Sequence, residues 1–298
     1  MAATLFGYAI NSDLPLIRTA DGPGERGVLR VRRSHSDLRA REGELVSWDE
    51  LDGIEFALAT SGPDLLVWCS ATGSYLIRGD ELLTCPAGHP NDWEHRIGST
   101  ILPLMLTERG DLALHAAAVV EGGEAILFCG PAGRGKSTLA AALALRGYEV
   151  LSDDGVVLSG LEDQPMAWPG ATGVRITPTA FAALAGRGQD CERGSSYKAT
   201  HLIGRAPSTA ARSVAAVVLL APREGKEPEA DRLEPMAAQP ALMPHVLHGG
   251  PDRLAAAMRR TGLLVSRVPV FRARLPQHLE DAGAHAEMLL GRLQDSPY

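Results

Sequence analysis

The segment at residues 130–137 constrains the fold more than any other part of the chain. It reads GPAGRGKS and matches the phosphate-binding pattern G-x-x-x-x-G-K-[ST] in full. The apolar run at 125–129 before it is typical of a buried strand. The run at 137–146 after it is rich in strong helix formers and is followed by Gly147, a helix-ending residue. Strand, glycine turn and helix in this order predict a binding site for a nucleoside triphosphate.

Each part of this loop has a predicted role. The glycines let the backbone turn so that successive N–H groups point at phosphate oxygens, and the helix N-terminus adds partial positive charge. We expect Lys136 to reach the β- and γ-phosphates and Ser137 to bind Mg²⁺, which makes ATP and Mg²⁺ the predicted cofactors. The predicted nucleotide-binding residues of the loop are Gly130, Gly133, Arg134, Gly135, Lys136, Ser137 and Thr138.

Two carboxylates and a histidine flank the loop. Asp153 and Asp154 follow a strand-like run at 148–151, and His115 opens the apolar run at 115–120. A carboxylate at a strand end beside such a loop usually holds the metal. Successive side chains of an extended backbone point to opposite sides, so two adjacent carboxylates can divide the work. One can face Mg²⁺ while the other accepts the proton of an incoming hydroxyl.

The combination resembles a known family. A histidine before the loop, the glycine motif, a helix ending in Arg-Gly and then Asp-Asp is the pattern of HPr kinase/phosphorylase and its bacterial relatives. The resemblance implies that Asp153 is the base facing a substrate serine, that Asp154 lies on the metal side and that His115 supports Asp153. It also implies that Arg175 lies near the nucleotide and that Lys198 neutralises charge on the transferring phosphoryl group.

Segments outside the motif extend the resemblance. FGYAINSDLPL near the start, LHAAAVV before the loop and VPVFRARLPQHLEDA near the end look like the HPr-kinase-like enzymes of lasso-peptide gene clusters. Those enzymes phosphorylate the C-terminal serine of a precursor peptide, which is therefore the implied partner. The second glycine-containing signature of the bifunctional HPr enzyme is missing between residues 186 and 221. An HPr-type carrier-protein kinase, a nucleotide-dependent switch or ATPase, and a kinase for a small molecule such as free serine remain as alternatives.

The pattern of short strands predicts two domains. Residues 1–98 contain apolar runs at 5–10, 27–32, 54–59, 65–70 and 74–78 with turn-rich breaks, which predicts a small β-rich domain for peptide docking, partner docking or oligomer formation. Residues 99–298 alternate strand and helix patterns, which predicts an α/β kinase domain. Hairpins of 115–120 with 125–129 and of 148–151 with 156–158 predict a mixed sheet. The resemblance implies the HPr kinase/phosphoenolpyruvate carboxykinase type of P-loop core.

Several further segments carry weaker predictions. Residues 92–95, DWEH, lie in a connection rich in Pro, Gly and Asn and are predicted to form a loop, followed by an apolar helix at 97–108. The polar stretch at 186–207 predicts a mobile loop over the substrate, in which Arg187 and Arg193 are further candidates beside Lys198. A terminal helix is predicted at 276–293. His245 and His248 have H-x-x-H spacing without a third ligand, which argues against a metal site.

Composition limits the function classes. The net charge of −7 and the isoelectric point near 5.7 argue against nonspecific binding to nucleic acid or to an anionic membrane. The four cysteines show no metal-binding spacing, which fits reduced thiols. The N-terminus has no basic region followed by an apolar stretch, and no run reaches the length of a membrane span. We expect a cytoplasmic protein, with homo-oligomer formation left open.

Overall fold

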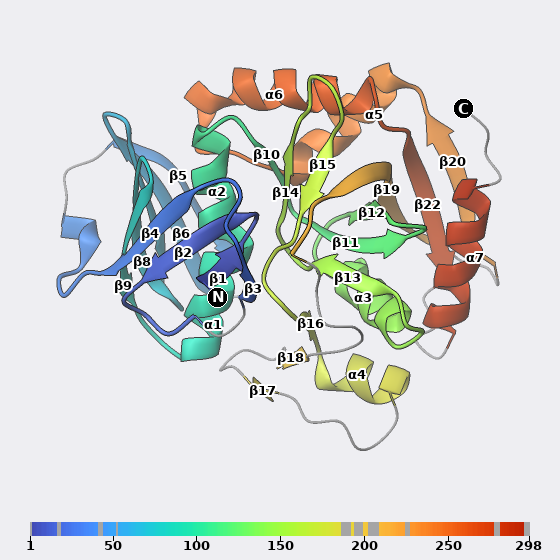
Figure 1. The fold of residues 1–298 in the computed structure, drawn as a ribbon, viewed down its shortest axis with the longest axis horizontal. Coiled ribbons are helices and arrows are strands. Elements are labelled where there is room, and N and C mark those ends of the chain that lie inside the picture. The colour runs from blue at the N-terminus through green and yellow to red at the C-terminus, as the bar shows by residue number, and fades with distance from the viewer. Residues whose placement is uncertain are drawn as a thin grey trace.

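The fold is seen in a computed structural model that describes residues 2–16, 19–40, 44–51, 53–185, 192–193, 199–201, 209–223, 227–276 and 281–294. Two large sheets stand side by side, with a helical segment between them and further helices around the second sheet (Figure 1). The chain is therefore a mixed α/β protein with large sheets and few helices. No helix in the described ranges is long and apolar enough to cross a membrane.

The first sheet has nine strands in the order β3-β1-β2-β4-β9-β8-β7-β6-β5. Four of the five predicted strands lie close to the observed β4, β6, β7 and β8, whereas the run at 5–10 is split because Phe6 and Gly7 turn with φ of 52° and 78°. The bounds are β1 Ala2–Leu5, β2 Tyr8–Ser12, β3 Ala20–Gly22, β4 Val28–Arg33, a 3₁₀ turn Leu38–Ala40, β5 Glu44–Leu51, β6 Ile54–Ser61, β7 Asp64–Cys69, β8 Gly73–Arg78 and β9 Glu81–Pro86.

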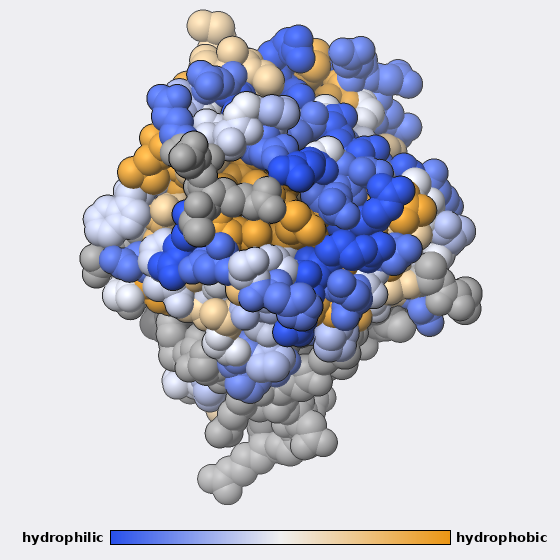
Figure 2. Space-filling model, turned by 90° about the vertical axis from the view of Figure 1, so that its left-hand side faces the viewer, coloured by the Kyte–Doolittle hydropathy of each residue, from blue (hydrophilic) through white to orange (hydrophobic). Residues whose placement is uncertain are grey.

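The two faces of this sheet differ. The inner face packs on the helical segment that follows it, through a buried cluster that includes Tyr75, Trp93 and Met105. The outer face carries apolar side chains in its middle, bordered by hydrophilic ones (Figure 2). On the edge strand β5, Leu45 and Trp48 are among the exposed large apolar residues. One face of the sheet is thus buried against the rest of the molecule, and the other is partly exposed.

Three helical pieces connect the sheets: α1 Pro90–Arg96, a π-helical turn Ile97–Ile101 and α2 Leu102–Glu108. The prediction of a loop at 92–95 was wrong, because these residues form α1 and Asp92, Trp93 and Glu94 are buried. Local signals support the helix: Pro90 occupies its first turn, and the His89 side chain accepts a hydrogen bond from the Asn91 N–H. The predicted helix at 97–108 is confirmed, with Pro103 tolerated near the start of α2.

The second sheet has ten strands. Eight follow the order β13-β11-β12-β19-β15-β14-β10-β21, while β22 pairs with β19 and β20 with β22. The pairs β12–β19 and β19–β22 are parallel and β11–β12 is antiparallel, so the predicted mixed sheet is confirmed. The bounds are β10 Leu112–Leu114, β11 Ala116–Glu121, β12 Glu124–Cys129, β13 Glu149–Ser152, β14 Val156–Ser159, β15 Met166–Trp168, β19 Arg212–Arg223, β20 Glu229–Leu233, β21 Val246–Leu247 and β22 Val270–Pro276.

One predicted hairpin does not exist. The strands at 148–151 and 156–158 correspond to β13 and β14, but β13 pairs with β11, and β14 pairs with β10 and β15. The turn between them passes through Asp154 with φ of 71°, and the chain then continues to another part of the sheet instead of folding back. The side chains of this turn therefore reach elements outside the ten-stranded sheet, namely β16 and α1.

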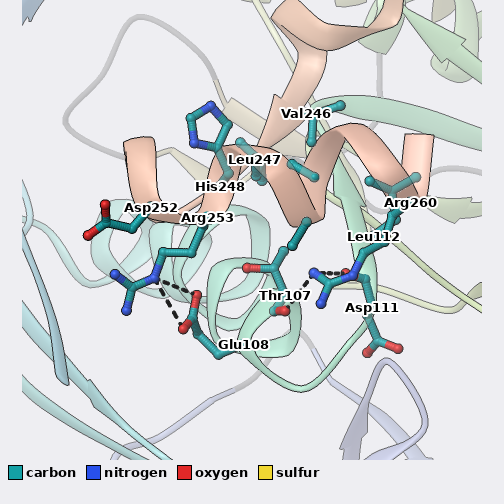
Figure 3. A pocket seen from close by; sticks show the side chains of 12 residues that line it. Thr107, Glu108, Asp111, Leu112, Val246, Leu247, His248, Asp252, Arg253 and Arg260 are labelled. Carbon is teal, nitrogen blue, oxygen red and sulfur yellow. Dashed lines mark hydrogen bonds and ion pairs between the residues drawn. The ribbon is translucent and has the colours of Figure 1, made fainter. Parts of the chain in front are cut away.

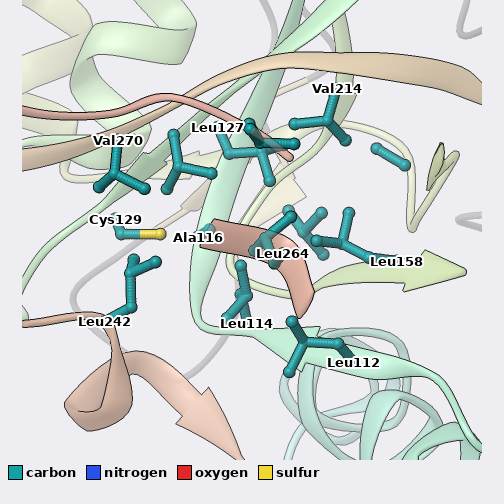
Figure 4. Packing of buried hydrophobic residues seen from close by; sticks show 14 of the residues in the cluster. Leu112, Leu114, Ala116, Leu127, Cys129, Leu158, Val214, Leu242, Leu264 and Val270 are labelled. Atoms are coloured by element: carbon teal, nitrogen blue, oxygen red, sulfur yellow. The ribbon is translucent and has the colours of Figure 1, made fainter. Parts of the chain in front are cut away.

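Helices cover both faces of the second sheet. Alternating residues of β12 show this: Leu127 and Cys129 face the cluster with α5 Pro235–Leu242 and α6 Pro251–Val265 (Figure 4), and Ile126 and Phe128 face the cluster with α3 Lys136–Ala144 and α7 Ala282–Gln294. The start of the last helix was predicted wrongly, because Pro276 ends β22. Strand β16 Val174–Ile176 and helix α4 Pro178–Ala185 lie beside α3 (Figure 1). Strands β18 Ala199–His201 and β17 Glu192–Arg193 continue a small sheet from β16.

Candidate active site around the phosphate-binding loop

The glycine motif lies between β12 and α3, as its sequence context predicts. Gly133 and Gly135 have φ of 77° and 88°, a left-handed backbone that favours glycine, and Gly135 is the N-cap of α3. Gly130 lies close to the backbone of Leu220 in β19, since an added Cβ would be 3.2 Å from the carbonyl oxygen. The loop therefore needs glycine at two positions for conformation and at a third for close packing.

Lys136 begins α3 and is buried, with a residual exposure of 7%. Its Nζ donates hydrogen bonds to the carbonyl oxygens of Gly130 at 2.7 Å and Pro131 at 3.3 Å. The ammonium group thus sits within the curve of the loop, where a phosphate would meet it. Burial raises the pKa of the neighbouring Cys129 thiol to about 12, so this cysteine stays protonated and belongs to the core.

Asp153 follows β13 and points inward, with an exposure of 4%. Its Oδ2 accepts a hydrogen bond of 2.9 Å from the backbone N–H of Arg175 in β16. The Arg175 guanidinium forms an ion pair with Asp92 of α1, and both side chains are largely buried. Arg175 consequently joins Asp153 to the helix before the second sheet.

Asp154 is held by two imidazoles. Its Oδ2 lies 2.9 Å from Nε2 of His95 in α1, and its Oδ1 lies 3.1 Å from Nδ1 of His115. The same Nδ1 is 3.0 Å from the Asp154 carbonyl oxygen. The Asp154 side chain is 32% exposed, and its φ of 71° is unusual for a residue other than glycine. It is therefore the member of the carboxylate pair that an acceptor molecule can approach.

The electrostatics of this triad favour an ionised carboxylate. Burial alone would raise the pKa of Asp154, but the hydrogen bonds from His115 and His95 bring the pKa well below its usual range. Burial lowers the pKa of His95 despite its contact with Asp154. Near neutral pH the carboxylate is charged, and a neutral His95 donates its Nε2 hydrogen to it.

The structure places the His115 ring beside the other carboxylate of the pair. His115 was expected to support Asp153, but it bonds to Asp154. The reason is the backbone at the turn: Asp153 still follows the strand direction toward β16, whereas the left-handed Asp154 turns its side chain toward the histidines. Arg175 contacts the carboxylate pair through its backbone N–H, which donates to Asp153. Lys198 and Arg187, and the side chain of Arg193, lie outside the residues that the structure describes.

A third histidine faces the loop. The carbonyl oxygen of His245, in the 3₁₀ turn Met243–His245, accepts a 2.7 Å hydrogen bond from the His115 N–H. Burial lowers the pKa of His245, and the charges of Lys136 and His115 act in the same direction. His248 instead contacts Gly250. Across the described part of the chain, no group of three or more His, Cys, Asp or Glu residues forms a metal site.

The residues at the loop fit a magnesium ion of the kind that nucleotides carry. Mg²⁺ prefers oxygen ligands and usually keeps several waters beside one or two protein groups and the phosphates. The Ser137 hydroxyl, half-buried in the first turn of α3, supplies such an oxygen. Asp154, predicted on the metal side, has its two oxygens engaged by imidazole nitrogens, which suits a role toward the acceptor better.

A separate hollow of about 180 Å³ lies between the end of α2, β21 and α6 (Figure 3). Arg253 pairs there with Glu108, and Arg260 donates to the carbonyl oxygens of Thr107 and Asp111. None of the predicted site residues lines this hollow. Its charged side chains stabilise the junction between α2 and α6 and have no visible part in the chemistry at the loop.

Sequence reasoning missed two residues of the site, Asp92 and His95. Both were assigned to a loop because of the surrounding Pro, Gly and Asn. The available signal was the helix pattern of residues 90–96: proline at the first position, an acid in the first turn and basic residues in the last turn. That pattern predicts a helix, although it does not predict that its polar side meets Asp154 and Arg175.

Comparisons with known proteins give a limited result. No protein-family model matches the sequence, and a search of curated proteins gives no match. Among solved structures, the chain is similar to the Hpr(Ser) kinase/phosphatase from Coxiella burnetii, with 18% sequence identity and a TM-score of 0.35 over 61% of this chain and 97% of that chain. A likeness at this level supports neither a family assignment nor a shared activity.

Proposed function

We propose that this protein is an ATP-dependent kinase that transfers the γ-phosphate to a serine hydroxyl. The supporting observation is a phosphate-binding loop accompanied by a partly exposed carboxylate, Asp154, that two imidazoles hold in place. The sequence resemblance supplies the acceptor: the C-terminal serine of a ribosomal precursor peptide, in the cytoplasm. A hydrolase or switch needs only a positioned water, and a carboxylate with two fixing partners suits an acceptor that must be oriented.

Each residue of the site has its own part in the phosphoryl transfer. Backbone N–H groups of the loop and Lys136 bind the phosphates and stabilise the charge that develops on them. Ser137 would hold Mg²⁺, which neutralises phosphate charge when bound. Asp154 orients the serine hydroxyl and accepts its proton as the bond from serine oxygen to phosphorus forms and the bond to the β-phosphate oxygen breaks. Asp153, buried and bonded to the Arg175 N–H, keeps the turn rigid.

This assignment gives the role of base, predicted for Asp153, to Asp154 and leaves Asp153 a structural role. Asp153 was predicted as the base, but it is 4% exposed and its Oδ2 already accepts a hydrogen bond from the Arg175 N–H in β16. Asp154 is accessible and ionised, which a proton acceptor needs to be. The low pKa of Asp154 makes it a weak base, yet phosphoryl transfer through a loose transition state asks mainly for orientation of the nucleophile, with little proton removal before the bond forms.

The test is mass spectrometry of serine-ended peptides incubated with ATP, Mg²⁺ and the protein. We expect a gain of one phosphate mass, abolished by replacing the terminal serine with alanine and lowered by Asp154→Asn more than by Asp153→Asn. The HPr-type alternative predicts phosphate on a folded carrier protein instead of the peptides. If ATP is hydrolysed while no acceptor gains phosphate, and Asp154→Asn hydrolyses it as fast as wild type, the kinase proposal is wrong and the switch alternative replaces it.

A further inference from the structure

Helix α1 belongs in sequence to the segment just after the nine-stranded sheet, yet one of its sides lies against the catalytic turn. Asp92 and His95 are three residues apart, so they project from the same side of the helix. Asp92 pairs with Arg175, and His95 bonds to Asp154. The chain therefore brings two polar side chains from α1 to two neighbouring points of the proposed active site.

We propose that His95 is a positioning residue of the active site: it fixes the Asp154 carboxylate in the orientation that receives the acceptor hydroxyl. This inference rests on the proposed kinase function. His95 reaches Oδ2 while His115 reaches Oδ1, so the two imidazoles hold opposite oxygens of one carboxylate. With one imidazole alone, the carboxylate could rotate about its Cβ–Cγ bond; with two, its plane is fixed.

The burial of polar side chains on this side of α1 argues against a purely structural role for it. A helix that only packed between two sheets would place apolar residues there, as α1 does with Trp93 on its other side. Burying Asp92 and the imidazole of His95, whose side chain is 13% exposed, is unfavourable unless each has a well-placed partner. Both partners lie far away in sequence, at the turn that carries Asp154 and in the strand that binds Asp153.

The packing of the turn supports the same conclusion. Gly155 lies against the backbone of Ser99 in the π-helical turn after α1, where an added Cβ would be 2.9 Å from the Ser99 Cα. The Ser152 hydroxyl donates to the Gly155 carbonyl oxygen at 2.6 Å and closes the turn from inside. The backbone of the turn is thus fixed by this packing, and His95 fixes the side chain that the turn presents.

The experiment measures kcat and the KM for ATP and peptide in His95→Gln, His95→Asn and wild type. Glutamine can place an amide N–H near the position of Nε2, whereas asparagine is too short to do so. We expect His95→Asn to lower kcat by about 10- to 100-fold with little change in the KM for ATP, as for a misplaced reacting group. His95→Gln should retain most of kcat.

Two further arms separate positioning from stability. His89→Ala removes the side-chain cap of α1 without touching the site, and should lower the melting temperature while leaving kcat unchanged. In the Asp154→Asn background, His95→Asn should cause no further loss, because His95 acts through that carboxylate. Equal kcat in His95→Asn and wild type, or losses that multiply in the double variant, would overturn the inference while the kinase stands. A wild-type protein that phosphorylates no acceptor would remove the proposed function and the inference together.

Discussion

The substitution Gly155→Ala tests the packing that fixes the turn between β13 and β14, which carries Asp154. Gly155 has no positive φ, so alanine meets no backbone penalty there and any effect is steric. The added Cβ would lie 2.8 Å from the carbonyl carbon and 2.9 Å from the Cα of Ser99, besides touching its oxygen. Carbon atoms pack at about 3.5–4.0 Å, so the two backbones must separate by about 0.7 Å or more. Side-chain rotation cannot relieve this, because the three nearest atoms all belong to the Ser99 backbone.

Two losses should follow from this displacement. Overpacking of this kind lowers the free energy of unfolding by about 1–3 kcal/mol. Asp154, the residue before Gly155, moves relative to His95 and His115. A misplacement near 1 Å can lower the catalytic rate by about 100-fold. Urea denaturation and single-turnover phosphorylation measure the two effects. Gly291→Ala in α7, where an added Cβ meets no atom within 4 Å, is the control and should be neutral or stabilising. A Gly155→Ala protein with stability within about 0.5 kcal/mol of wild type and unchanged kcat would refute the steric reasoning.

Three other predictions address the loop, the inter-sheet contact and pH. Lys136→Met should lower kcat by about 100- to 1,000-fold in the peptide assay, because a buried cation no longer meets the transferring phosphate. Arg26→Met should lower the free energy of unfolding by about 3–5 kcal/mol in urea, since Arg26 holds both oxygens of buried Asp111; Arg30→Met, at an exposed pair with Asp80, should change it by less than about 1 kcal/mol. Burial lowers the pKa of His95, so as the pH drops below about 6.5 the unfolded chain binds a proton before the folded protein does, and the free energy of unfolding decreases. The melting temperature should therefore drop less on acidification in His95→Gln than in wild type.

The parts of the fold that the sequence predicts well are those set by neighbouring residues. The phosphate-binding loop depends on glycines within a few positions of each other, and its strand and helix follow from adjacent runs. The β11–β12 hairpin likewise follows from the Gly122-Gly123 turn between two apolar runs. In each case the partner is close in the chain, so local pattern and final structure agree.

Predictions failed where the partner is distant. Strands β13 and β14 resemble a hairpin in sequence because only four residues separate their apolar runs, but each pairs with a different neighbour in the sheet. The pairing of β14 with β10 buries Val157 in the cluster with α2, which a hairpin with β13 would not do. Tertiary burial therefore decided the pairing, and no pattern within the segment carries that information.

The site shows the same division at the level of single side chains. The spacing predicts that Asp153 and Asp154 belong to the site at the phosphate-binding loop, but which of them is accessible depends on one backbone angle, the φ of 71° at Asp154. That angle turns Asp154 toward His95, a residue from the other side of the α1–Asp154 interface. A buried helix side with an acid and an imidazole three residues apart is costly on its own, and the cost is offset only where another segment supplies partners. When the apolar side of a helix already anchors it, buried polar residues on its other side are therefore a reason to look for a site. Helix α1 meets that condition.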